Sequence, residues 1–165
     1  MRMQDITLLY DYNYWANGRI LAASAKVSLE QFVAPTAHSY GSLRGTLVHT
    51  LDAEYAWREL LQHAAFPEEL RQDEFPTVDV VAQRWKEDET AMRDYLVSLR
   101  DQDLMEVVRY TLPNGEQRAR VLWHCLYHVV NHGTQHRSEA AVMLTDYGQS
   151  PGDLDLTVFT RESGI

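Results

Sequence analysis

Four histidines recur at every fourth position in the last third of the chain, at His124, His128, His132 and His136. Imidazole nitrogens are common ligands of divalent metal ions, and two histidines four residues apart on a helix can reach one ion. Four residues turn a helix by about 400°, so the side-chain direction drifts by about 40° at each step. The first and last histidines are therefore about 120° and 18 Å apart, and at most two neighbours can share a metal.

The apolar residues of the same segment indicate which histidines face the interior. They lie within about 40° of one direction on a helical wheel, and they are Leu122, Val129, Gly133, Ala140, Met143 and Tyr147. Measured from Val129, His136 lies at about −20°, His132 at −60°, His128 at −100° and His124 at −140°. The pair with access to a helical core is therefore His132 and His136. A metal would give these two rings polar partners, and a hydrogen-bonded pair without metal is the alternative.

A third ligand is needed, because structural and catalytic sites of this kind use three or four protein ligands. His38 falls in a predicted loop, and His63 falls at a predicted helix end. His49 lies in the middle of a predicted helix, where its face carries small or apolar residues at Gly45, Ala53, Ala56 and Leu60. Such a face favours either close helix packing or a cavity. We expect His49, His132 and His136 to form a three-histidine site that leaves a position open to water or substrate.

These side chains must be positioned by helices. Apolar residues recur at helical spacing in four long segments, which we expect at residues 4–26, 42–63, 77–100 and 121–147. Gly148 and Pro151 end the last helix. Ser28 and Gln31 form a capping box that predicts a break or a short helix before Pro35.

The connections between the helices are long for a bundle, especially after the second and third helices. Alternating residues on both sides of Pro113-Asn114-Gly115 predict a short β-hairpin at residues 107–119, with a plain loop as the alternative. The whole pattern predicts an all-α fold, a four-helix bundle with long connections, in a single domain over residues 1–165.

Composition restricts the function classes. Twenty-four acidic residues against fifteen basic ones give a formal net charge of −9, which argues against binding to nucleic acid or to an anionic membrane. No apolar run approaches the roughly 20 residues of a membrane span. The polar N-terminal segment with Asp5 is not typical of a signal peptide, so we expect a cytoplasmic protein. Cys125, the single cysteine, is expected to pack on the apolar side of the last helix rather than act as a nucleophile.

Four motifs in this order resemble those of one family across nearly the whole chain. They are Trp15-Ala16-Asn17, His49 followed by Glu54 and Trp57, Asn131-His132-x-x-x-His136-Arg137, and the tail PGDLDLTVF. Together they resemble the DinB/YfiT-like superfamily of bacterial metal-binding proteins. The resemblance implies a four-helix bundle, often a homodimer, in which His49, His132 and His136 bind a divalent metal. Zn²⁺ and Ni²⁺ both suit imidazole ligands.

The resemblance also implies an activity. Relatives include S-transferases that use bacillithiol or mycothiol, and a maleylpyruvate isomerase, so we expect a metal-dependent thiol S-transferase. Its partners would be a low-molecular-weight thiol and a small electrophile. Two alternatives stay open: hydrolysis by metal-bound water, and a non-catalytic role as a stress-induced metal-binding or interaction protein. Ser138-Glu139 stands where many members carry Gly-Gln, and this added negative charge argues against carrying over a particular substrate.

Several further residues are candidates for the functional site, and each has more than one interpretation. Asp52 lies one turn beyond His49. It is either a weak fourth ligand, or a hydrogen-bond acceptor that orients a ligand, or else a solvated surface residue. Tyr10, Tyr14, Glu54 and Arg137 are candidate substrate contacts, although such residues are more often found in packing or surface roles.

Overall fold

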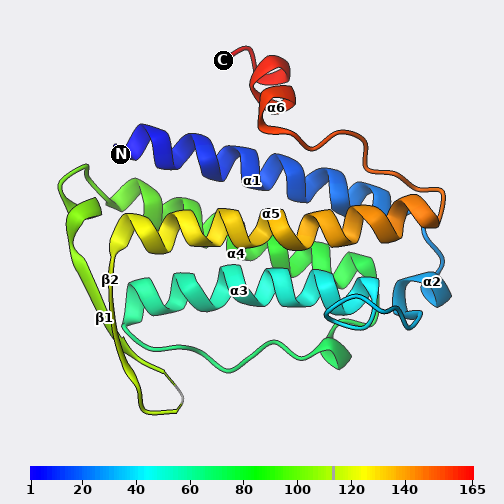
Figure 1. Cartoon of the computed structure of the whole chain (residues 1–165), viewed down its shortest axis with the longest axis horizontal. Coiled ribbons are helices and arrows are strands. Elements are labelled where there is room, and N and C mark those ends of the chain that lie inside the picture. Colours follow the sequence, from blue (N-terminus) through cyan, green and yellow to red (C-terminus); the bar gives the residue numbers. More distant parts are fainter. Residues whose placement is uncertain (113) are drawn as a thin grey trace.

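Four long helices run side by side in the computed structural model, which describes residues 1–112 and 114–165 (Figure 1). They are α1 (Met3–Ser24), α3 (Leu43–His63), α4 (Val78–Ser98) and α5 (Leu122–Asp146). Helix α5 packs against both α1 and α3, and α4 completes the bundle by contacting α1 and α3. The predicted all-α bundle is confirmed, and each long helix lies within a few residues of its predicted range.

Local sequence signals explain where the helices begin. The Ser42 side chain accepts a hydrogen bond from the Gly45 amide at 2.9 Å and caps α3, and the Thr77 side chain caps α4 in the same way. Such caps satisfy backbone amides that have no partner within the helix. The predicted capping box of Ser28 and Gln31 is present, and it opens the short helix α2 (Leu29–Val33).

The predicted β-hairpin is confirmed and lies directly before α5. Strand β1 (Val107–Thr111) pairs antiparallel with β2 (Gln117–Val121), so the hairpin ends two residues beyond its predicted range. Gly115 adopts a φ of 85°, a left-handed conformation that glycine adopts without strain. Pro113, the first residue of the predicted turn, lies outside the described residues.

The connections carry further short elements. They contain two 3₁₀ turns, η1 (Gln72–Glu74) and η2 (Asp103–Met105), and the chain closes with α6 (Leu156–Ser163). The sequence pattern predicts no element in that tail. Phe159 of α6 packs on Trp15 of α1 with ring centroids 5.6 Å apart, so burial of an aromatic ring holds this eight-residue helix on the bundle. No helix in the described part of the chain has the length and apolar character that would let it cross a membrane.

The inward face of α5 is the one that the helical wheel selected. Val129, Gly133, His136 and Ala140 are buried, whereas His124 and His128 are exposed. The middle of α5 therefore presents His132 and His136 toward α3, and this placement builds the site.

Candidate metal centre

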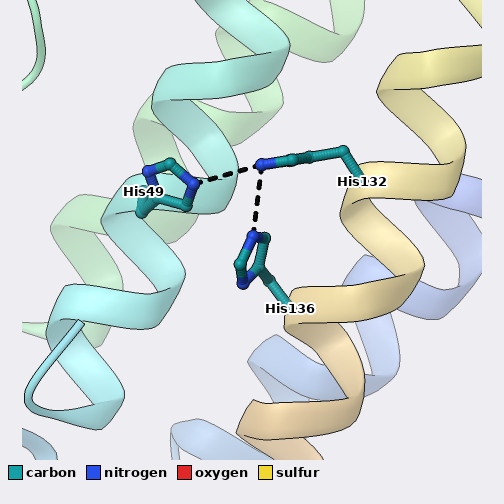
Figure 2. Close-up of side chains that lie close together, drawn as sticks. All are labelled: His49, His132 and His136. Atoms are coloured by element: carbon teal, nitrogen blue, oxygen red, sulfur yellow. Dashed lines mark hydrogen bonds between the residues drawn. The ribbon is translucent and has the colours of Figure 1, made fainter. Parts of the chain in front are cut away.

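Three histidine rings from two helices converge between α3 and α5 (Figure 2). His132 Nε2 lies 3.1 Å from His49 Nε2 and 3.2 Å from His136 Nε2. The ligand atoms of all three rings lie within 4.8 Å of one another, and this is the only such group of histidine, cysteine and carboxylate residues in the described part of the chain. The structure thus brings together the three residues that the sequence analysis selected, as a group that could hold a metal ion.

The pattern of contacts at His132 is difficult to satisfy by hydrogen bonding alone. A neutral imidazole Nε2 either carries one hydrogen or offers one lone pair. His132 Nε2 faces the Nε2 atoms of both His49 and His136, so at most one of these two contacts is a good hydrogen bond. A cation placed among the three atoms would accept three lone pairs at once.

The environment keeps two of the rings neutral. Burial, followed by the nearby His136, lowers the pKa of His49 to about 4. Burial, and then the neighbouring histidines, lower the pKa of His132 to about 4. Metal ions bind the neutral form of histidine, because protonation removes the lone pair that forms the bond. Both rings are therefore in the ligand form at neutral pH.

Tyr40 covers one side of the centre. Its ring stacks on His49 with centroids 3.7 Å apart and an interplanar angle of 12°, and it meets His136 edge-on at 5.2 Å. Gly45 makes this approach possible, since a Cβ at position 45 would lie 2.0 Å from the Tyr40 carbonyl oxygen. The small residue noted on the face of His49 therefore accommodates the loop before α3 and, beside it, the Gln72 side chain of η1.

A carboxylate stands behind His136. Glu139 Oε2 lies 3.3 Å from His136 Nδ1, and the Ser39 hydroxyl donates to Glu139 Oε1 at 3.1 Å. An Nδ1–H directed at a carboxylate leaves the Nε2 lone pair facing the other two histidines. The negative charge of Glu139 is thus in contact with the site.

A buried polar network connects the four long helices of the bundle. The carboxylate of Glu54 accepts hydrogen bonds from Asn13 at 2.8 Å, Asn17 at 2.9 Å and Trp85 at 2.9 Å. Arg137 donates to the amide oxygens of the same Asn13 and Asn17. Glu54 and Arg137 are only 2% and 3% exposed, and their network joins α1, α3, α4 and α5.

The remaining candidate residues make contacts that stabilise the fold. The Asp52 carboxylate accepts a hydrogen bond from the Leu70 amide at 2.8 Å, so it fastens the connection after α3. Tyr10 and Tyr14 lie in the core. Cys125 is buried, and burial raises its pKa to about 11, which agrees with a packing role.

Sequence reasoning missed Tyr40 altogether, and it did not identify the contact between Glu139 and His136. Tyr40 lies in a loop, where no periodicity points to a partner. Glu139 stands three residues after His136, a spacing that places two side chains side by side on a helix, so that contact carried a detectable signal.

The chain is similar to several known proteins. The model of the DinB family matches residues 3–163. The Protein DinB of Bacillus subtilis (strain 168) is 25% identical over 162 residues, which cover 94% of each chain. A crystal structure of a DinB-like protein from Bacillus cereus ATCC 10987 superposes with a TM-score of 0.74 at 16% identity, covering 92% of this chain and 97% of that one.

A conserved protein from Enterococcus faecalis also superposes, with a TM-score of 0.65 at 13% identity, covering 84% of this chain and 94% of that one. At these identities the two solved structures support the fold. The family model spans nearly the whole chain, including all three histidines of the centre. The chain therefore belongs to the DinB family.

Proposed function

We propose that the chain binds a divalent metal ion through His49, His132 and His136 and acts as a metal-dependent thiol S-transferase. The observation that carries the metal site is the convergence of three Nε2 atoms, from two helices, on one point. Two of the rings are held neutral, and the third has a carboxylate at its Nδ1.

The spacing of the nitrogens fits an ion of the expected kind. Tetrahedral coordination at about 2.0–2.1 Å per bond sets neighbouring ligand nitrogens about 3.3 Å apart. The two contacts of His132 Nε2, at 3.1 and 3.2 Å, are close to that value. Zn²⁺ and Ni²⁺ are both compatible with an all-imidazole donor set.

Three protein ligands leave room for a small molecule, and a thiol suits such a position. A bound Zn²⁺ or Ni²⁺ would lower the pKa of a thiol and favour the nucleophilic thiolate. The chain's own cysteine does not supply this nucleophile, because Cys125 is buried and its pKa is raised to about 11. The transferred sulfur would therefore come from a low-molecular-weight thiol. Glu139 would orient the His136 ring, and Tyr40 would shield one side of the centre.

A turnover assay tests this proposal. Protein loaded with Zn²⁺ or Ni²⁺ is mixed with bacillithiol, mycothiol, glutathione or coenzyme A and with the electrophile monochlorobimane, and formation of the fluorescent thioether is followed. We expect turnover with at least one thiol, loss of turnover in His132→Ala, and full turnover in the control His63→Ala, whose imidazole is exposed at the end of α3. Metal-loaded protein that turns over none of the four thiols would overturn the transferase assignment.

A further inference from the structure

A separate cavity lies beside the three-histidine centre. Its volume is about 330 Å³, and its lining consists of Trp57, Tyr110, Arg120, His124, Cys125 and His128. The His128 ring also lies 5.6 Å from the ring of His132, centroid to centroid. The cavity therefore adjoins the centre through His128, and it uses the two histidines of the series that the centre leaves out.

The walls of the cavity are mostly aromatic. The Trp57 ring lies 5.2 Å from the His128 ring and 5.8 Å from the Tyr110 ring, both in edge-to-face arrangements. The Cys125 thiol is uncharged at neutral pH, and burial raises its pKa further above the ordinary value, to about 11. These surfaces favour a flat, apolar ligand body, and the volume is in the range of small-molecule sites.

One cation faces this aromatic lining. In the hairpin register Val108 pairs with Arg120 and Tyr110 pairs with Arg118, so these four residues share one face of the two strands. Tyr110 is buried against the bundle, which directs Arg120 to the same side. The Arg118 guanidinium donates to Glu116 at 2.9 Å. The Arg120 guanidinium makes no such ion pair within residues 1–112 and 114–165.

The electrostatic character of the cavity is opposite to that of the whole chain. The formal net charge is −9, yet none of the described residues that line the cavity is acidic. Helix α5 begins here without a side-chain cap and without an acidic residue in its first turn, so no carboxylate of that turn offsets the positive end of its dipole, although the Leu122 amide donates to the Glu106 carbonyl. Arg120 and the start of α5 together favour an anion.

We propose that this cavity binds a carboxylate-bearing substrate with a flat apolar body, whose carboxylate pairs with Arg120 and whose body packs against the aromatic wall that Trp57 and His128 form together. Guanidinium groups pair with carboxylates through two parallel hydrogen bonds. A ligand held in this way extends toward His132, and so toward the proposed metal-bound thiol. The inference names the electrophile class of the proposed transferase and, in that respect, rests on the proposed function.

Ligand binding to the metal-free protein tests the cavity independently of catalysis. Naphthalene-2-carboxylate and the uncharged naphthalene-2-carboxamide have nearly the same shape, and calorimetry gives the affinity of each. We expect the native chain to bind the carboxylate at least tenfold more tightly, and Arg120→Gln to remove that preference. The control Arg161→Gln changes the net charge equally at an exposed residue of α6, and it should keep the preference.

The outcomes of this binding experiment distinguish the cavity proposal from the transferase proposal. Equal affinity for the two compounds, no binding of either, or an unchanged preference in Arg120→Gln would overturn the cavity assignment, whether or not the protein is a transferase. A carboxylate preference that depends on Arg120 would support the cavity even if the thiol assay showed no turnover. In that case the transferase proposal alone would fail.

Discussion

Replacing Gly45 by alanine should weaken metal binding without touching a ligand. The new Cβ would lie 2.0 Å from the Tyr40 carbonyl oxygen, and real Cβ atoms essentially never approach closer than 3.0 Å. The loop or the start of α3 must therefore move by at least 1.0 Å, and either movement disturbs the stacking of the Tyr40 ring, whose centroid lies 3.7 Å from that of His49. Losing a residue that orients a ligand typically weakens metal affinity about 10–100-fold, equivalent to about 1.4–2.7 kcal/mol.

The measurement is competition for Zn²⁺ against a chromophoric chelator, combined with denaturant unfolding. Alanine also favours a helix interior over glycine by about 1 kcal/mol, so a change in stability alone does not report on the site. Gly18→Ala is the matched control, because a Cβ there meets no atom within 4 Å and Zn²⁺ affinity should stay unchanged. Native Zn²⁺ affinity in Gly45→Ala would refute the idea that the Tyr40 loop shapes the centre.

Three further predictions concern charges in and near the site. Glu139→Gln should weaken Zn²⁺ binding by about tenfold or more in the same competition assay, because His136 Nδ1 loses its carboxylate partner. Glu54→Gln should lower the free energy of unfolding by about 3–5 kcal/mol in a urea titration, because it leaves the buried Arg137 without its countercharge. Metal-free protein should lose stability as the pH falls from about 6.5 to about 4, because the unfolded chain protonates His49 and His132 near 6.5 and the folded chain near 4. Each ring contributes at most about 1.4 kcal/mol per pH unit, and less because both are partly exposed.

Each of these predictions has a comparison that can contradict it. Native Zn²⁺ affinity in Glu139→Gln would show that the contact with His136 is incidental. Glu162→Gln removes a partly exposed ion pair with Arg19 and should cost about 0–1 kcal/mol, so an equally small loss in Glu54→Gln would contradict the buried network. A His49→Gln, His132→Gln double variant should show a shallower pH dependence, and an unchanged slope would contradict the assignment to these rings.

The sequence predicted the part of the site that follows from helical periodicity. The drift of about 40° at each four-residue step separates His132 and His136 from His124 and His128. The structure places the first pair inward and the second pair outward. His49 was less strongly determined, because small and apolar residues occur on more than one face of its helix. Gly45 was correctly placed on the face of the helix that carries His49. Its role, which is to leave space for the Tyr40 loop, is visible only in the structure.

The features that were missed depend on tertiary packing. Tyr40 approaches His49 from a loop whose path depends on the clearance at Gly45. The network of Glu54 and Arg137 joins residues far apart in the chain, so no local pattern reveals it. Helix α6 is held by the contact of Phe159 with Trp15, and eight residues carry too little periodicity to identify a helix by themselves.

The metal content of the purified protein tests the central proposal most directly. Elemental analysis of the native chain, of His49→Ala and of His136→Ala, each purified in the same way and exposed to the same Zn²⁺ or Ni²⁺, gives the stoichiometry per chain. We predict about one ion per native chain and loss of most of that metal in both variants, since two imidazoles seldom hold a divalent ion. Full metal content in both variants would contradict the three-histidine centre.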